Sequence, residues 1–309
     1  MHVFARSSSG SVAALGEVKL IAAIRRWLGS VSPATPFGIG DDCAVLPAVS
    51  GRQLITVDPV IFGRHFDHSV PPRAVGAKLL KRNLSDLAAM GGTPTAAVLA
   101  LTLDPHTCLH WLEEFYRGLA ACARRHAVTV VGGDVAQSDG TVAASLTLLG
   151  KAAGPRILTR IGARIGDRIC VTGSLGGSLR SGHHYRFVPR LAEGAWLARQ
   201  KEVTAMLDLS DGLAKDIHAL TPPGSAPNIS ECLLPLRRGC DTRAALSDGE
   251  DYELLFTLSQ RKDFSRFTRD WQRAFPRLKV TCIGRFERKS ARHQNSLNLQ
   301  GYHGFEHLH

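Results

Sequence analysis

The sequence lacks the cysteine spacings that build disulfide frameworks or zinc sites. Its 309 residues include seven cysteines, but no two of them form a C-x-x-C pair. An odd number of widely spaced cysteines is typical of reduced thiols. The chain also has no apolar run of about 18 residues, the length that spans a membrane, and residues 1–20 show no secretory signal pattern. We therefore expect a cytoplasmic protein without a membrane segment.

Aromatic residues are scarce, at 6% of the chain. The 38 Lys and Arg outnumber the 27 Asp and Glu, so the formal net charge is +11. Basic chains attract nucleic acids, membrane surfaces or small anions. However, the basic residues are scattered, and few aromatic side chains are available to stack on bases. This pattern disfavours nucleic acid as a partner.

No internal repeat of fixed period and no low-complexity tract occurs in the sequence. Hydrophobic residues make up 44% and charged residues 21%, which is typical of globular proteins and excludes disordered and fibrous classes. A chain of 309 residues corresponds to about two domains of roughly 150 residues. A Gly/Ala/Pro joint at 150–155 follows an apolar run, so we expect domains at 1–152 and 153–309.

Hydrophobic periodicity predicts alternating helices and strands, which indicates an α/β or α+β fold. In the first domain the predicted helices are 17–28, 72–90 and 107–125, and the predicted strands are 43–46, 54–57, 60–66, 95–103, 128–131 and 142–149. In the second domain the predicted strands are 168–171, 252–258 and 280–283, and the predicted helices are 191–200, 211–220 and 260–275.

Acidic residues beside glycine or serine recur at the ends of these predicted strands and helices. The six segments are 40–42, 56–58, 83–86, 132–134, 208–212 and 249–251. Such ends are where α/β proteins gather ligand groups. Converging carboxylates repel one another unless they bind cations, and Mg²⁺ prefers oxygen ligands. Because the sequence has neither a G-x-x-x-x-G-K-[ST] loop nor a kinase H-R-D set, nucleotide phosphates would be held through metals.

Each acidic segment, taken alone, also has a structural alternative. The alternatives are turns for Asp41-Asp42 and for 132–134, an N-cap for Ser210 or Asp211, a solvated loop for Glu250 and Asp251, and a packed or surface position for His65. Asp86 differs, because it shares an apolar helix face with Leu79 and Met90. A buried carboxylate needs a metal ion or an ion pair. The recurrence of these segments favours the functional interpretation.

Five short motifs, in their sequences and in their order along the chain, resemble those of the thiamine-monophosphate kinase family, within the AIR-synthase-like ATP-binding superfamily. The strings are GIGDD at 38–42, NLSDLAAMG at 83–91, GGD at 132–134, DLSDGL at 208–213 and GEDYEL at 249–254. The resemblance implies an N-terminal mixed sheet with helices that binds ATP and pairs in a homodimer, followed by a C-terminal α/β domain. It also implies transfer of the ATP γ-phosphate to thiamine phosphate with several Mg²⁺ ions, a step of thiamine diphosphate biosynthesis.

The same resemblance implies roles for individual residues. The implied metal ligands are Asp42, Thr56, Asp58, Asp86, Asp134, Asp208 and Asp211, with Asp41 beside them. The implied ATP contacts are Gly133, Asp134, Arg160 and Ser210, and the implied thiamine phosphate contacts are His65, Glu250 and Tyr302. We expect Asp86 and Asp211 to be the most critical, and no general base is needed because the acceptor is already a phosphate.

The sequence also departs from the family pattern. Val57 and Gly177 stand where the family has a hydroxyl and an acidic residue, and the segments 178–189 and 237–243 are shortened. Two other function classes compete with the kinase. One is a sister ATP-dependent enzyme of the superfamily with a different acceptor. The other is a non-catalytic binder of nucleotide or nucleic acid, which the basic 261–273 helix favours.

Overall fold

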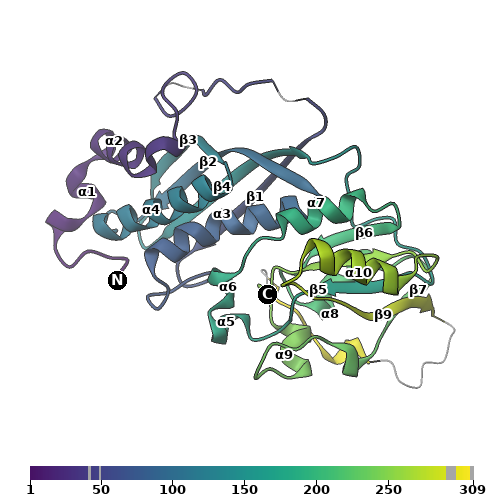
Figure 1. The fold of residues 1–309 in the computed structure, drawn as a ribbon. Helices are drawn as coiled ribbons and strands as arrows, with labels where there is room; N and C mark the ends of the chain where they lie inside the picture. Colours follow the sequence, from purple (N-terminus) through teal and green to yellow (C-terminus); the bar gives the residue numbers. More distant parts are fainter. Residues whose placement is uncertain (41–42, 49, 290–296, 307–309) are drawn as a thin grey trace. The chain divides into compact units, whose positions relative to one another are not determined.

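The computed structural model describes residues 1–309 except 41–42, 49, 290–296 and 307–309 (Figure 1). Its contacts divide the chain into two compact units, Met1–Leu87 with Thr93–Lys151 and Ala88–Gly92 with Ala152–His309. The predicted boundary after residue 152 lies one residue beyond this division. The inclusion of Ala88–Gly92 in the second unit was not predicted from the sequence.

The first unit contains a four-stranded sheet of order β1-β4-β2-β3. Its strands are β1 (Gln53–Ile61), β2 (Gly92–Leu103), β3 (Thr129–Gln137) and β4 (Val142–Ala152). The helical segments are η1 (Ser8–Gly10), α1 (Val12–Leu15), α2 (Glu17–Leu28), η2 (Gly29–Val31), α3 (Pro72–Ala89) and α4 (Leu109–Arg125). Because β1 is antiparallel to β4 and β2 is parallel to β3, the sheet is mixed, as expected.

Helices α3 and α4 run side by side along one face of this sheet (Figure 1). Glycines allow their backbones to touch: a Cβ on Gly76 would lie 2.0 Å from the Phe115 carbonyl oxygen, and one on Gly118 would lie 2.0 Å from that of Arg73. Strand β4 alternates buried and half-buried residues along its length. The sheet therefore buries one face under the helices and leaves the other more open.

The second unit contains a five-stranded antiparallel sheet of order β6-β8-β5-β9-β7. Its strands are β5 (Arg168–Thr172), β6 (Val203–Asp208), β7 (Ser225–Ile229), β8 (Leu254–Leu258) and β9 (Val280–Arg288). The helical segments are α5 (Ser178–Ser181), α6 (His183–Arg186), α7 (Leu191–Arg199), α8 (Leu213–Asp216), η3 (Ile217–Leu220), η4 (Glu231–Leu233), α9 (Thr242–Ser247), α10 (Phe264–Ala274) and η5 (Leu299–Gly301).

Both faces of this second sheet are covered by helices. On one face, Phe256 of β8 packs with Phe267 and Trp271 of α10 and with the residues of α7. On the other face, Ile169 of β5 lies in a cluster with the residues of α8, η3 and α9. The two clusters take alternate residues of the same strands, as the period-2 geometry of a strand requires. The α/β class expected for this domain is confirmed.

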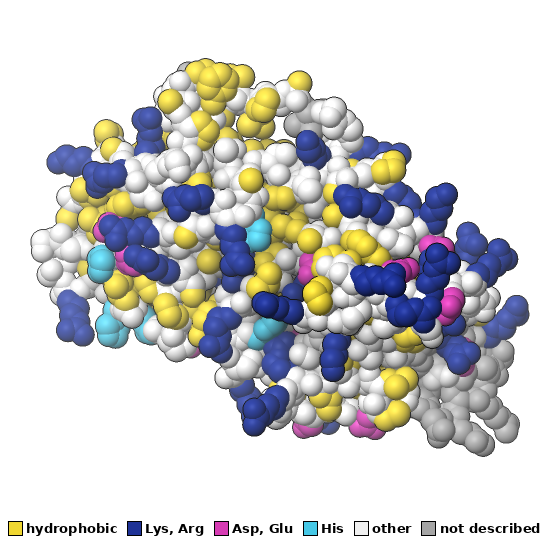
Figure 2. Space-filling model, viewed as in Figure 1, with side chains coloured by type: hydrophobic (Ala, Val, Ile, Leu, Met, Phe, Trp, Pro, Cys, Tyr) yellow, Lys and Arg dark blue, Asp and Glu magenta, His cyan; other side chains and the backbone are white. Residues whose placement is uncertain are grey.

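Several predicted elements differ from the observed ones. Residues 43–46, predicted as a strand, form none, and the predicted strands 54–57 and 60–66 are replaced by the single strand β1. The predicted helix 211–220 is the short helix α8 followed by the 3-10 turn η3. Within the described ranges, no helix is long and apolar enough to cross a membrane. Figure 2 shows Lys and Arg side chains scattered over the viewed face rather than gathered in one stripe.

Candidate nucleotide and metal site

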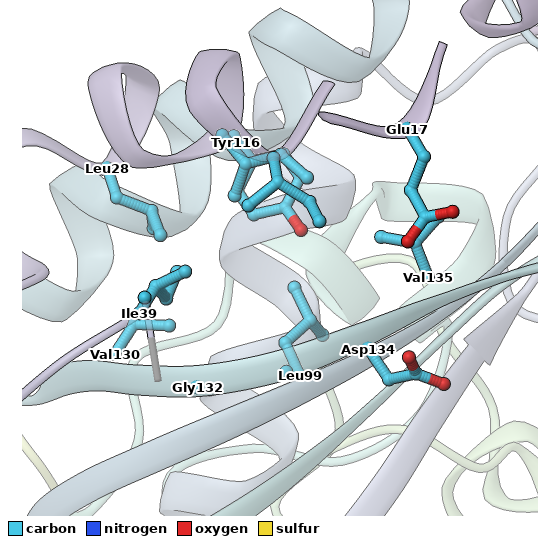
Figure 3. Close-up of a pocket in the computed structure, with 13 residues that line it drawn as sticks. Glu17, Leu28, Ile39, Leu99, Tyr116, Val130, Gly132, Asp134 and Val135 are labelled. Atoms are coloured by element: carbon cyan, nitrogen blue, oxygen red, sulfur yellow. The ribbon is translucent and has the colours of Figure 1, made fainter. Parts of the chain in front are cut away.

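A cavity of about 460 Å³ opens in the first unit between α2, α4 and strands β2 and β3 (Figure 3). Apolar side chains, among them Ile24, Leu28 and Leu99, form most of its walls. Glu17 and Asp134 lie on opposite walls at the same end of the cavity in Figure 3. An apolar slot with a polar end is typical of a site for a flat ring that carries a charged group.

The cavity brings together two of the strings singled out in the sequence. Gly132, Gly133 and Asp134 line it from β3, and Ile39 and Gly40 line it from the segment between η2 and β1. Two predicted ATP contacts therefore border one cavity. Asp41 and Asp42, which directly follow Gly40, lie outside the described residues.

Position 133 can hold only glycine, because the neighbouring strand β2 lies too close for a side chain. A Cβ at this position would lie 2.1 Å from the Leu99 carbonyl oxygen of β2, whereas a Cβ on Gly132 would meet only the Val98 side chain at 3.3 Å. The missing side chain permits parallel pairing and leaves the β3 backbone open to the cavity. A turn at 132–134, the structural alternative, is wrong because these residues are inside a strand.

Sequence reasoning missed Tyr116, which lines the same cavity from α4. Its ring is 3% exposed, and burial raises the pKa of its hydroxyl, so the side chain stays neutral. In Figure 3 the ring lies above Leu99. The helical periodicity of 109–125 predicts only that Tyr116 is a core residue. Its role in the cavity wall becomes visible in the structure, where it lines the same cavity as Gly132 and Gly133.

Three predicted metal ligands lie between β1 and α3. The Thr56 hydroxyl donates to Asp86 Oδ2 at 2.5 Å, and Asp58 Oδ1 accepts from Arg82 Nη2 at 3.0 Å. Both Thr56 and Asp58 are on the strand face that also carries the buried Val60. Val57, the departure from the family pattern, alternates to the opposite face and is 61% exposed.

The donors in this group have the chemistry that a hard cation requires, since hydroxyl and carboxylate oxygens are the ligands Mg²⁺ prefers. The neighbouring Asn83 is fully buried, and its Oδ1 has no hydrogen-bond partner among the described residues. Across the described part of the chain, however, no three His, Cys, Asp or Glu side chains are grouped closely enough to hold a metal ion.

In the second unit, the 208–212 string forms a tight loop around a carboxylate that the sequence analysis overlooked. Asp216 Oδ2 accepts hydrogen bonds from the backbone N–H groups of Ser210, Asp211 and Gly212, at 3.0, 3.0 and 3.2 Å. Burial raises the pKa of Asp216 to about 7, and the negative charges of Asp208 and Asp211 add to this effect. Such a concentration of acidic groups attracts cations.

Neither Ser210 nor Asp211 caps the following helix, so that structural alternative is wrong. The N-cap position of α8 is Gly212, and no side chain caps it. Asp211 instead pairs with Lys215 Nζ at 2.9 Å, and Asp208 is 5% exposed at the end of β6. The loop therefore holds its carboxylates beside one another rather than using them to start a helix.

The 249–254 string lies directly against this loop. The Glu250 N–H donates to the Ser210 carbonyl at 2.7 Å, and the Tyr252 N–H donates to that of Leu209 at 2.8 Å. Asp251 is 2% exposed, so a solvated loop is wrong for this residue. Its carboxylate accepts from the Gly176 N–H and from Arg237, while burial raises its pKa to about 7.

The remaining predicted residues differ in how far they are buried. Arg160 is exposed beside β6, where the preceding carbonyl of Thr159 accepts from Met206. His65 is 9% exposed in the turn after β1, and its Nδ1 accepts from the Ile61 N–H at 3.1 Å. Tyr302 packs against the core of the second unit, with the Arg243 guanidinium 5.6 Å from its ring centre.

Tyr302 also leads into a segment that reaches the acidic loop. The Phe305 N–H donates to the Asp211 carbonyl at 2.9 Å, and Lys215 Nζ donates to the Phe305 carbonyl at 2.5 Å. Within the second unit, three strings far apart in the sequence are therefore joined: 208–212, 249–252 and 302–305. Carboxylates, backbone hydrogen bonds and an aromatic ring are therefore held close together in this part of the second unit.

The fold and these groups define a protein of the AIR-synthase-related class. Residues 40–152 match the family described as AIR synthase related protein, N-terminal domain. This match includes β1, α3 and the cavity-lining glycines of β3.

The relatives define the family more narrowly. The thiamine-monophosphate kinase of Rhodopirellula baltica is 34% identical over 273 residues, covering 82% of this chain and 84% of the relative. The crystal structure of the Stenotrophomonas maltophilia thiamine-monophosphate kinase has 30% identity and a TM-score of 0.71, covering 90% of this chain and 96% of that one. A structure described as AaThiL complexed with AMPPCP and TMP has 31% identity and a TM-score of 0.66, covering 90% and 92%. The chain belongs to the thiamine-monophosphate kinase family.

Proposed function

We propose that this protein transfers the γ-phosphate of ATP to thiamine phosphate and so forms thiamine diphosphate. The observation that carries the proposal is the cavity in the first unit, where Gly133 and Asp134 meet apolar walls and Tyr116. Apolar walls suit an adenine ring, and the acidic end suits metal-bound phosphates. The related structure solved with AMPPCP and TMP supports the same pair of ligands.

The reaction needs positioning and charge neutralisation rather than a base. Thiamine phosphate already carries a phosphate nucleophile, so in-line attack on the γ-phosphate requires two anionic groups to approach each other. Bound Mg²⁺ would supply positive charge that lowers the repulsion between these groups. The described residues that we propose as Mg²⁺ ligands are Thr56, Asp58, Asp86 and Asp134 in the first unit and Asp208 and Asp211 in the second. The net charge of +11 attracts polyanionic ATP.

The test is conversion of thiamine phosphate to thiamine diphosphate with ATP and Mg²⁺, followed by chromatography. We expect product from the wild type and almost none from Asp86→Asn, because an amide replaces one carboxylate oxygen beside Thr56. Asp270→Asn, which alters an exposed carboxylate of α10, serves as the control and should stay active. Mg²⁺-dependent ATP binding without product would refute thiamine phosphate as the acceptor.

The cavity can be tested separately as the ATP site. An Ile24→Trp substitution on α2 would place a large ring in the cavity, and we expect the KM for ATP to rise while that for thiamine phosphate is unchanged. Val18→Trp is the matched control, since Val18 is on the same helix but is 82% exposed. An unchanged KM for ATP in Ile24→Trp would show that the nucleotide binds elsewhere.

We also propose a homodimer formed through the first unit, in the cytoplasm. The open face of its sheet exposes Ile55 and Val57 of β1, at 70% and 61%, with Val98 of β2 at 36%. Exposed apolar sheet faces are typical of subunit interfaces. In sedimentation velocity, Val57→Lys should convert a dimer to a monomer. Ile161→Lys, at an 87% exposed apolar residue of the second unit, should not.

A further inference from the structure

Two rings from different segments hold the carboxylate of Glu250. The Tyr252 hydroxyl donates to Glu250 Oε1 at 3.1 Å, and His184 Nδ1 lies 3.5 Å from Oε2. The His184 side chain is 9% exposed and that of Glu250 is 19% exposed, so the contact is largely shielded from water. His184 belongs to α6, inside the segment 178–189 that we expected from the sequence to depart from the family pattern.

The same short helix also supports the other ring. Phe187, the residue after α6, stacks on Tyr252 with ring centres 4.0 Å apart and planes 20° from parallel. His183 Nε2 lies 2.9 Å from the Asp251 carbonyl oxygen. Residues 183–187 therefore contact every residue from Glu250 to Tyr252. Of the two rings beside the Glu250 carboxylate, His184 belongs to this segment and Tyr252 is packed against it.

The backbone of the acidic segment needs such support. Glu250 and Tyr252 have φ values of 63° and 51°, in the left-handed region that residues with side chains rarely adopt. Strained conformations of this kind persist where the surrounding contacts hold them, and they gather at functional sites. The contacts from α6 and the hydrogen bonds to Leu209 and Ser210 provide that restraint.

We infer that His184 is a positioning residue for the acceptor: it orients the Glu250 carboxylate toward thiamine phosphate, so α6 contributes to acceptor specificity. This inference rests on the proposed function. A carboxylate accepts up to about four hydrogen bonds, so its contacts with the two rings are compatible with a further bond to a ligand. A fixed carboxylate suits a cationic ring system with N–H donors, because less freedom is lost when the ligand binds.

Steady-state kinetics of His184→Ala test the inference. We expect the KM for thiamine phosphate to rise about tenfold, the effect of losing one hydrogen bond to a charged group, while the KM for ATP is unchanged. His184→Asn should restore most of the affinity, because its side-chain amide can donate from the position of Nδ1. Arg180→Ala, an exposed change in the neighbouring helix α5, is the matched control.

The outcomes separate this inference from the function on which it rests. A wild type that forms no thiamine diphosphate would refute the proposed function and the inference with it. An active wild type with unchanged constants in His184→Ala would refute the inference alone. If both His184 variants lower the melting temperature and change both KM values equally, His184 has a structural role only, and the inference is overturned.

Discussion

Removing the Glu253 carboxylate should strongly destabilise the second unit. Glu253 is 2% exposed and accepts from Arg190 Nε at 2.8 Å, from Arg190 Nη2 at 2.6 Å and from the Thr172 hydroxyl at 2.6 Å. In Glu253→Leu the largely buried Arg190 guanidinium would lose the carboxylate with which it pairs and would remain in a poorly solvated site. Breaking a buried ion pair from one side costs about 3–5 kcal/mol.

The expected loss is near the lower end of that range, about 3 kcal/mol, because the Arg190 side chain is 17% exposed and keeps some hydration. With a urea m-value of about 2 kcal/mol/M, the unfolding midpoint should fall by about 1.5 M. Far-UV circular dichroism during urea unfolding measures this shift. Glu202→Leu is the control, because its pair with Lys262 is at the surface and contributes at most about 1 kcal/mol.

A double-mutant cycle tests the reasoning behind this number. Arg190→Met with Glu253→Leu replaces both charges by apolar groups, so the double variant should be more stable than the sum of the single losses implies. Equal losses in Glu253→Leu and Glu202→Leu, or strict additivity in the cycle, would refute the claim that an unpaired buried charge causes the destabilisation.

Three further outcomes follow from particular contacts. Gly133→Ala should abolish ATP binding and lower the melting temperature, because its Cβ would collide with the Leu99 carbonyl, whereas Gly132→Ala should fold normally; calorimetry and nucleotide titration distinguish them. Asp263→Ala should cost about 1 kcal/mol in urea unfolding, because Asp263 Oδ1 caps α10; an unchanged midpoint would contradict this. Burial lowers the pKa of His183 from 6.5, so the unfolded chain binds a proton at this side chain more readily than the folded protein does. The free energy of unfolding should therefore fall as the pH drops below about 6.5. Between pH 7.5 and 5.5, His183→Gln should lose less stability than the wild type.

Long, strongly periodic elements could be predicted from the sequence, whereas edge strands could not. The Pro start and Gly stop of 72–90 predicted α3 to within one residue. Pro59 wrongly divided β1 into two predicted strands, and β7, which contains Pro227, was missed. Both strands are at the edge of their sheets, where proline's missing N–H removes no ladder hydrogen bond, and a sequence does not reveal which strand will be at an edge.

The candidate site was partly predictable for a similar reason. Gly133, Thr56 and Asp86 could be identified because each lies in a short motif that resembles the family's. In the structure Gly133 lines the cavity, and Thr56 and Asp86 are in contact. Tyr116 and Asp216 could not be found in this way. Tyr116 follows the apolar period of its helix, and Asp216 acts through backbone bonds that form only when the 210–212 loop closes around it.

Helix α3 has a consequence for how this chain can be divided. The helix begins in the first unit, but its last residues, Ala88 and Ala89, pack in the second unit's core with Leu197 and Trp271. The Gly91 and Met90 carbonyls that follow accept from residues 153 and 158. A recombinant fragment that begins at residue 153 would lack these α3 residues, which would leave a cavity in that core. The backbone N–H groups of residues 153 and 158 would also lose their acceptors. Each unit is made of two separate stretches of the chain, because α3 begins in one unit and ends in the other. Neither unit can therefore be exchanged between relatives as one continuous segment.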